Sequence, residues 1–302
     1  MSRMIFVLGM HRSGTSLTTN VLNELGVAIS DDLIPPSREN VRGYFESQTI
    51  ATLQDDILKV FGTAWNAPNS FRALPPQWWK APAAAPYRNA LTRYVASELD
   101  QHPIWAFKDP RTMRMMPLWM EIVAELGAEP SFLLATRNPN EVAGSLYARG
   151  KTDPAIAELL WLEHNVDALL ACRERIAAIV DYQGWFEQPV SQARDIIERL
   201  ALPYEGDDEQ LGAMLARVIA PELRHHVPAK NFQLPFTGPL YQALVKSDRS
   251  SALQLAELFN ASRALMNAVT SALYTKFNEL VAIANQQQQR IADLEAQLRE
   301  RA

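Results

Sequence analysis

The chain has 302 residues, 48% of them hydrophobic, and carries a formal net charge of −5 at pH 7. This length and apolar content suffice for one α/β core of about 250 residues with an extension. The negative balance excludes a general binder of nucleic acids or anionic membranes, and the single cysteine, Cys172, excludes an internal disulfide.

The predicted elements begin almost at the first residue. An apolar run, Met4–Leu8, predicts a buried parallel strand, and a helix is expected over Thr15–Leu25. The strand starts too early for a basic and apolar leader to precede it, and no later apolar run has the length of a transmembrane helix. We therefore expect a cytoplasmic protein without a membrane span.

The loop between this strand and this helix has the composition of an anion site. Backbone N–H groups at a helix start have no partner within the helix, and glycines let the loop turn tightly around a bound anion. Hydroxyl groups add donors, and one arginine adds charge. The residues expected to bind a phosphate group here are His11, Arg12, Ser13, Gly14, Thr15 and Ser16.

The loop can be compared with two kinds of phosphate-binding loop. The spacing from Gly9 to Gly14 matches the front of a nucleotide-triphosphatase P-loop, but Thr15 stands where that motif has lysine. The run Arg12-Ser13-Gly14-Thr15-Ser16 instead resembles the 5′-phosphosulfate loop of sulfotransferases that use 3′-phosphoadenosine 5′-phosphosulfate (PAPS). A P-loop kinase or NTPase remains the alternative, with the strand before Asp109 as its Walker B strand.

A short strand over Gly26–Ile29 and a helix over Ile50–Phe61 come next, with Glu46 between them. Glu46 follows an aromatic pair, so partial desolvation would make it a usable base. The alternative is an ordinary glutamate at a helix start. The proline-rich segment Thr63–Pro86 is expected to be irregular, and its tryptophans would either stack on a sugar or adenine or pin the loop to the core.

Beyond a helix over Tyr87–Leu99, the strand Ile104–Phe107 ends in Lys108 and Asp109, with Arg111 just after them. The C-terminal ends of strands in an open α/β sheet face the ligand crevice, so these charges are delivered to it. Lys108 is expected in the catalytic group, and Asp109 is the rival of Glu46 as base. The alternative is a structural cluster of salt bridges.

A second signature follows a helix over Met113–Leu126. The strand starting at Ser131 runs to Arg137, and Ser145 lies in the next helix. In the sulfotransferases, an arginine at a strand end and a serine eight residues later hold the 3′-phosphate of PAPS. The resemblance gives this role to Arg137 and Ser145.

The remaining elements complete the predicted domain and add an extension. They are a helix over Pro154–Arg175, a strand over Ile176–Tyr182, a helix from Gln188 to Leu202 and a helix over Glu205–Val218. The resemblance also implies a basic segment over the 3′-phosphate, for which Arg224 is the first choice and Lys230 the second. A heptad frame then places Phe277, Leu280, Ala284, Gln287, Ile291, Leu294 and Leu298 on one seam.

Taken together, the sequence predicts a three-layer α/β/α fold with a central parallel sheet of about five strands over residues 1–245. Residues 246–302 are expected to be a helical extension, coiled coil from about residue 266, which pairs with itself or with a partner protein, or packs on its own domain. The resemblance implies a bacterial PAPS-dependent sulfotransferase, needing no metal and releasing adenosine 3′,5′-bisphosphate. Context favours a carbohydrate or lipid-linked glycan as acceptor, and a non-catalytic scaffold is a second alternative.

In that reaction, the resemblance has Gly14, Thr15 and Ser16 cradle the 5′-phosphate while Arg12 stabilises the leaving oxygen. Glu46 or Asp109 would take the proton of the acceptor.

Overall fold

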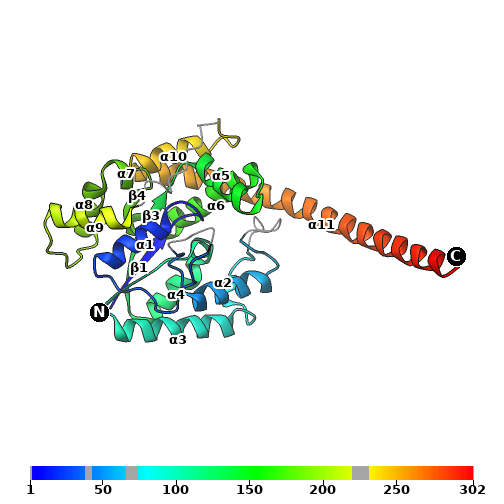
Figure 1. Ribbon diagram of the computed structural model, residues 1–302, viewed down its shortest axis with the longest axis horizontal. Coiled ribbons are helices and arrows are strands. Elements are labelled where there is room, and N and C mark those ends of the chain that lie inside the picture. Colours follow the sequence, from blue (N-terminus) through cyan, green and yellow to red (C-terminus); the bar gives the residue numbers. More distant parts are fainter. Residues whose placement is uncertain (1, 38–42, 66–73, 220–230, 302) are drawn as a thin grey trace. The chain divides into compact units, whose positions relative to one another are not determined.

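The computed structural model describes residues 2–37, 43–65, 74–219 and 231–301. The chain divides into two compact units, Met1–Phe259 and Asn260–Ala302. Figure 1 shows the strands inside the first unit with helices around them, and the long C-terminal helix that continues into the second unit. The first unit is an α/β domain built on a parallel sheet.

The sheet has four strands in the order β2-β1-β3-β4. All three pairings are parallel, so the C-terminal ends of the strands lie along one edge. The strands are β1 (Arg3–Leu8), β2 (Ile104–Phe107), β3 (Glu129–Thr136) and β4 (Ile176–Asp181). This edge is where the anion loop, Lys108 and Arg137 leave the sheet.

The sequence predicts about five strands, and the described residues form four. The segment Gly26–Ile29 makes only a single bridge, between Ala28 and Trp105, with the Ala106 N–H donating to the Ala28 carbonyl over 2.8 Å. The chain then turns away, because Asp32 accepts hydrogen bonds from the Thr49 N–H and the Tyr94 hydroxyl. These contacts direct the chain away from the sheet edge, so its pairing with β2 ends after one bridge.

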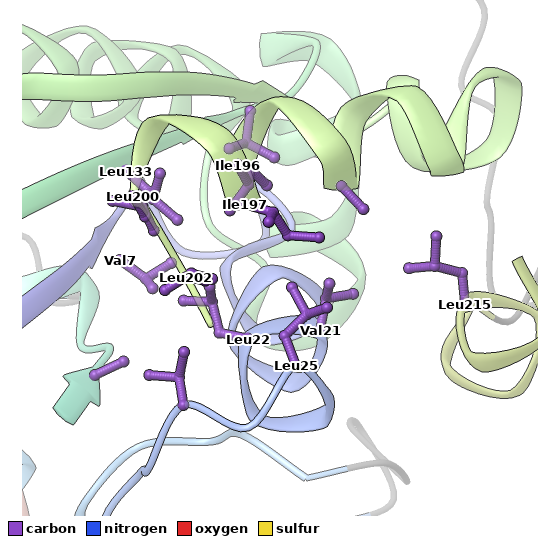
Figure 2. Close-up of a cluster of buried hydrophobic side chains, with 14 of the residues drawn as sticks. Val7, Val21, Leu22, Leu25, Leu133, Ile196, Ile197, Leu200, Leu202 and Leu215 are labelled. Atoms are coloured by element: carbon purple, nitrogen blue, oxygen red, sulfur yellow. The ribbon is translucent and has the colours of Figure 1, made fainter. Parts of the chain in front are cut away.

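One face of the sheet is covered by α1 (Thr15–Glu24), α8 (Pro189–Arg199) and α9 (Asp208–Val218). Figure 2 shows the buried aliphatic cluster between them, with Val7 and Leu133 of the sheet near Leu22 of α1 and Ile196 of α8. Burial of such side chains stabilises the fold by about 1.5–3 kcal/mol each.

The opposite face carries aromatic side chains. Phe6 makes an edge contact with Trp119 of α4 (Met116–Leu126) at 5.9 Å between ring centroids, and it also packs on Phe107 and Phe132 of the neighbouring strands. Because consecutive residues of a strand point to opposite faces, Phe6 and Val7 serve different layers. Helices on both faces give the predicted three-layer α/β/α architecture.

Other helices differ from the prediction in their ends or were not predicted. The helix expected from Met113 begins as a 3-10 turn, Pro110–Met115, because Asp109 caps its start by accepting from the Arg111 N–H. The remaining α-helices described in the first unit are α2 (Gln48–Val60), α3 (Ala85–Gln101), α5 (Pro139–Gly150), α6 (Pro154–Cys172), α7 (Gly184–Glu187) and α10 (Thr237–Val245), of which α7 and α10 were not predicted. Short 3-10 turns lie at Trp78–Lys80, within the segment expected to be irregular, and at Arg173–Arg175.

The last helix, α11 (Arg249–Arg301), belongs to both units. Ala252, Ala256 and Phe259 are buried, so its first turns pack with the α/β unit, beyond the predicted boundary at residue 245. In the second unit the predicted seam residues Phe277 and Leu280 are exposed. Within the described ranges, no helix combines the length and the hydropathy that a membrane crossing requires.

Candidate functional site

The loop after β1 adopts a backbone that few residues tolerate. Arg12 has φ 71° and Gly14 has φ 90°, both in the left-handed region. The Ser13 N–H donates to the Met10 carbonyl over 3.1 Å, which closes the turn. Gly14 is the N-cap of α1 and offers no side chain to its first N–H groups. The helix start therefore suits an external anion.

Tyr182, the residue after β4, holds the loop from the side. A Cβ at Gly14 would lie 2.6 Å from Cδ2 of Tyr182, so only glycine fits there. The Arg137 guanidinium packs on the same ring, 4.2 Å from the centroid of Tyr182. One aromatic ring thus connects the anion loop to the predicted 3′-phosphate residue.

The structure brings Arg12, Arg137 and Ser145 together. Nε of Arg12 donates to Oγ of Ser145 over 2.8 Å, and Nη1 of Arg137 donates to the Arg12 carbonyl over 3.3 Å. Arg137 also forms an ion pair with Glu141 at 2.8 Å. Burial, and then the guanidiniums of Arg149 and Arg137, lower the pKa of Arg12. A bound anion would relieve this repulsion.

The second group of charges surrounds Glu46. Nζ of Lys108 donates to the Glu46 carboxylate, to Oγ of Ser16 over 3.2 Å and to the Tyr44 carbonyl over 2.9 Å. Phe45, with φ 55°, makes the turn that aims Glu46 at Lys108. Lys108 therefore links the first turn of α1 to a candidate base.

Arg111 ties the three carboxylates of this group together. It binds both oxygens of Asp109 at 3.0 and 2.9 Å, Asp55 at 2.7 Å and Glu46 at 3.5 Å. Burial lowers the pKa of Arg111, but Asp109, Asp55 and Glu46 outweigh this and raise it. With Lys108, two cations face three carboxylates, and we call these five residues the carboxylate network.

Asp109 lies deeper in this network than Glu46 does. Its exposed fraction is 1%, and Arg111 binds both of its oxygens. The pKa of Asp109 is raised, first by burial; the charge of Arg111 opposes this effect and that of Glu46 adds to it. Glu46 is also buried, but it borders Lys108 and, through Lys108, Ser16 at the helix start. Of the two rival bases, Glu46 is the one connected to the anion loop.

His11 packs under the loop against Trp65. Their rings stack with centroids 4.1 Å apart. Burial, followed by the charge of Arg111 and of other nearby groups, holds the pKa of His11 well below its ordinary value. Its Nε2 and the Oγ of Ser13 are buried without a hydrogen-bond partner in the described structure. Both atoms lie in the anion loop, where a polar ligand could pair with them.

Three further residues of the site escaped the sequence interpretation. Tyr182 was assigned to a strand end, Arg111 was expected at the crevice but given no role of its own, and Arg149 was not singled out. Arg149 carried a signal, because it lies four residues after Ser145 and so shares its helix face. The predicted Arg224 and Lys230 lie outside the described residues. Among those described, no cluster of three metal-binding side chains occurs.

Comparisons with known proteins give similarities of fold. No family model matches the chain, and no curated protein matches it. A sulfotransferase, STF9 from Mycobacterium avium, aligns over 81% of this chain and 74% of its own with 18% identity and a TM-score of 0.48. The sulfotransferase domain of the Synechococcus PCC 7002 olefin synthase aligns over 86% and 96% with 18% identity and a TM-score of 0.41.

A third solved structure is retinol dehydratase in complex with androsterone and the inactive cofactor PAP. It aligns over 72% of this chain and 65% of its own with 12% identity and a TM-score of 0.32. At these identities and TM-scores, the likenesses do not assign the chain to a family.

Proposed function

We propose that this protein is a sulfotransferase that moves a sulfuryl group from PAPS to a hydroxyl or amine acceptor. The observation that carries the proposal is the convergence of Arg12, Arg137 and Ser145, which are joined by hydrogen bonds of 2.8 and 3.3 Å. The resemblance to sulfotransferases implies that these side chains belong to two phosphate sites of one nucleotide. Their proximity supports that assignment.

The donor set of the loop fits the phosphates of such a nucleotide. The start of α1 has no side-chain cap, and the buried Ser13 hydroxyl has no partner in the described structure. The residues that would hold the 5′-phosphate are Ser13, Gly14, Thr15 and Ser16, and Arg137 and Ser145 would hold the 3′-phosphate. When bound, PAPS supplies the activated sulfur–oxygen bond that is broken in the transfer.

The residues of the site divide the remaining work among them. Arg12 would stabilise negative charge on the leaving oxygen, and Glu46 would accept the proton that the acceptor loses as its oxygen or nitrogen bonds to sulfur. Lys108, which contacts both Ser16 and Glu46, holds the base next to the loop. Arg111, which is paired with Asp109, forms an ion pair with Glu46 and so positions it. Placement and charge are sufficient, as in phosphoryl transfer.

The P-loop kinase or NTPase is the alternative, and the spacing from Gly9 to Gly14 is the feature in its favour. It requires Asp109 to hold Mg²⁺, but in the structure Arg111 occupies both oxygens of this carboxylate. No lysine follows Gly14, and the pair of Arg137 and Ser145 has no role in that reaction.

Thermal unfolding with adenosine 3′,5′-bisphosphate, and separately with ATP and Mg²⁺, distinguishes the two functions. A ligand at 100 times its dissociation constant adds ~2.7 kcal/mol of stability. We expect stabilisation by the bisphosphate and its loss in Arg12→Ala, whose own melting temperature stays near that of the wild type. Stabilisation by ATP and Mg²⁺ alone would reverse the assignment.

Transfer of radiolabelled sulfate from PAPS into cell extract then tests catalysis against a scaffold role. We expect labelled glycan or lipid-linked glycan with the full chain and none with Arg12→Ala. Label found only on a small metabolite or peptide would contradict the proposed carbohydrate acceptor. Binding of the bisphosphate without any transfer would favour the non-catalytic scaffold.

We also propose that the second unit pairs with the same segment of a second copy. Its heptad seam includes Phe277, Leu280, Ile291 and Leu294, all more than half exposed. Gln287 interrupts the seam at a d position. In a parallel pair in register, the two Gln287 side chains would meet and hydrogen-bond to each other, whereas a different partner would need its own polar residue at that layer.

A further inference from the structure

Arg149 extends the site on the side of the carboxylate network. It lies one turn after Ser145 on α5, and the two side chains share a helix face. Its guanidinium lies 5.4 Å from the ring centroid of Trp65 and 5.9 Å from that of Tyr44. Arg149, Trp65 and Tyr44 are all partly exposed. We call these three side chains the Arg149 patch.

The patch borders both charged groups of the site. Trp65 stacks on His11 of the loop at 4.1 Å between ring centroids, and the Arg111 guanidinium lies 5.6 Å from the centroid of the Trp65 ring. The charge of Arg149 also lowers the pKa of Arg12, after the larger effect of burial. The Tyr44 carbonyl accepts hydrogen bonds from Ser16 over 3.0 Å and from Lys108 over 2.9 Å. Arg149 therefore borders both the loop for the donor and the network that holds the proposed base.

The proposed donor does not account for this third arginine. Arg12, Arg137 and Ser145 are the residues proposed to bind the phosphates of the nucleotide. The rings near Arg149 are those of Tyr44 and Trp65, which have no part in those phosphate sites. Placing another guanidinium near Arg12 has an electrostatic cost that simple packing would avoid. Planar guanidinium groups stacked on aromatic rings are well suited to bind carboxylate or phosphate with two hydrogen bonds.

We propose that the Arg149 patch binds a compact oxyanion, a carboxylate or a phosphate monoester, on the acceptor. This inference rests on the proposed function and narrows its acceptor to negatively charged molecules. Arg149 acts there as a specificity-determining residue. It orients the acceptor so that its hydroxyl or amine faces Glu46.

The test compares pairs of ligands in which one member carries an anionic group and the other a neutral group at the same position. Full-length protein saturated with adenosine 3′,5′-bisphosphate is titrated with nitrophenyl β-glucuronide and with nitrophenyl β-glucoside, and, to separate phosphate from carboxylate, with glucose 6-phosphate and with glucose. We expect the charged member of one pair to bind about 10- to 100-fold more tightly, as charged hydrogen bonds allow. Arg149→Met should bring that ratio close to one, and Arg149→Lys should retain part of it.

Two controls keep the outcome specific. Lys151→Met removes a charge two residues away and should leave the ratio unchanged, and Arg149→Met should still be saturated by the bisphosphate, so that both ratios are measured on loaded protein. Equal binding within both pairs, no binding of either charged probe, or an Arg149→Met variant that keeps the wild-type ratio would overturn the inference. If the wild type binds the charged probes selectively but not the bisphosphate, the proposed function fails instead.

Discussion

Nε of Arg12 donates a hydrogen bond to Oγ of Ser145 over 2.8 Å, although 133 positions separate the two residues in the chain. This bond joins the anion loop to α5 and sets the spacing of the two proposed phosphate sites. The guanidinium and the hydroxyl are thereby held in place before a nucleotide binds. Such preorganisation reduces the entropic cost of binding.

Ser145→Ala is expected to weaken the binding of adenosine 3′,5′-bisphosphate by about 10-fold or more. A hydrogen bond to a charged group contributes about 1.5–3 kcal/mol. The variant loses the proposed hydrogen bond from Ser145 to the 3′-phosphate, and Arg12 loses the hydroxyl to which its Nε donates. Isothermal titration measures the affinity. Ser191→Ala, at an exposed position of α8, should bind as the wild type does. Unchanged affinity in Ser145→Ala would remove this serine from the site.

Glu46 and Asp109 should respond differently to loss of charge. Glu46→Gln is expected to reduce sulfate transfer by ~10² to 10⁴ with nearly unchanged bisphosphate affinity, because a base is lost. Asp109→Asn should instead destabilise the fold by about 3–5 kcal/mol, because the buried Arg111 guanidinium loses the charge of the carboxylate that binds it through both oxygens. Transfer assays and denaturant unfolding measure the two effects. A stable Asp109→Asn variant without transfer would make Asp109 the base.

Gly14→Ala should abolish bisphosphate binding. Its Cβ would lie 2.6 Å from the Tyr182 ring at φ 90°, so the loop must shift away from Tyr182. Gly26→Ala is a matched control, because Gly26 has φ 87° and no atom within 4 Å of the added Cβ. Both variants carry backbone strain of about 1–3 kcal/mol, and only the first loses binding. Comparable affinities in the two variants would show that the Tyr182 contact does not shape the site.

Acid should destabilise the protein partly through His164. This residue is fully buried, and burial, with a smaller effect of Arg114, lowers its pKa to about 3. Between that value and its ordinary pKa of about 6.5, the unfolded chain binds more protons than the folded chain, so stability rises with pH and is lost as pH falls. The expected contribution is about 1.4 kcal/mol for each pH unit below about 6.

His164→Leu should remove this slope from the free energy of unfolding measured by urea between pH 4.5 and 7.5. His102→Gln, at a partly exposed position after α3, should keep the slope of the wild type. Parallel curves for the wild type and His164→Leu would show that His164 takes no part in acid unfolding.

The proposed pairing of the C-terminal helix predicts a change in mass. The full chain should behave as a dimer in light scattering. The double variant Phe277→Ser with Leu280→Ser should behave as a monomer, because each substitution removes apolar area from the seam. Gln286→Ser, off the seam, should remain dimeric. A monomeric wild type would contradict the pairing, and bisphosphate binding should be the same in all three proteins.

Much of the edge of the sheet could be predicted from the sequence. Apolar runs ending at Gly9, Lys108 and Arg137 indicate buried strands, and parallel strands bring their C-terminal ends to one edge whatever the loops between them do. Positions at strand ends therefore follow from local patterns. The same reasoning overestimated Gly26–Ile29, where side-chain contacts of Asp32 with later helices decide the path of the chain.

The partners within the site could not be predicted in this way. Glu46 reaches Lys108 only because Phe45 adopts a positive φ, a conformation that the sequence around it does not announce. Whether Arg111 turns toward Asp109, Asp55 or Glu46 depends on packing between α2 and the turn after β2. Contacts between distant segments of this kind require the folded chain.

The carboxylate network has an electrical consequence for the proposed reaction. Its two cations and three carboxylates sum to a negative charge when all are ionised, whereas Arg12 lies beside two other guanidiniums. In the transfer, Glu46 would gain a proton while electron density grows on the oxygen near Arg12, so each region would move toward neutrality. In the proposed reaction, the negative charge of the network and the positive charge around Arg12 would therefore decrease in the same step.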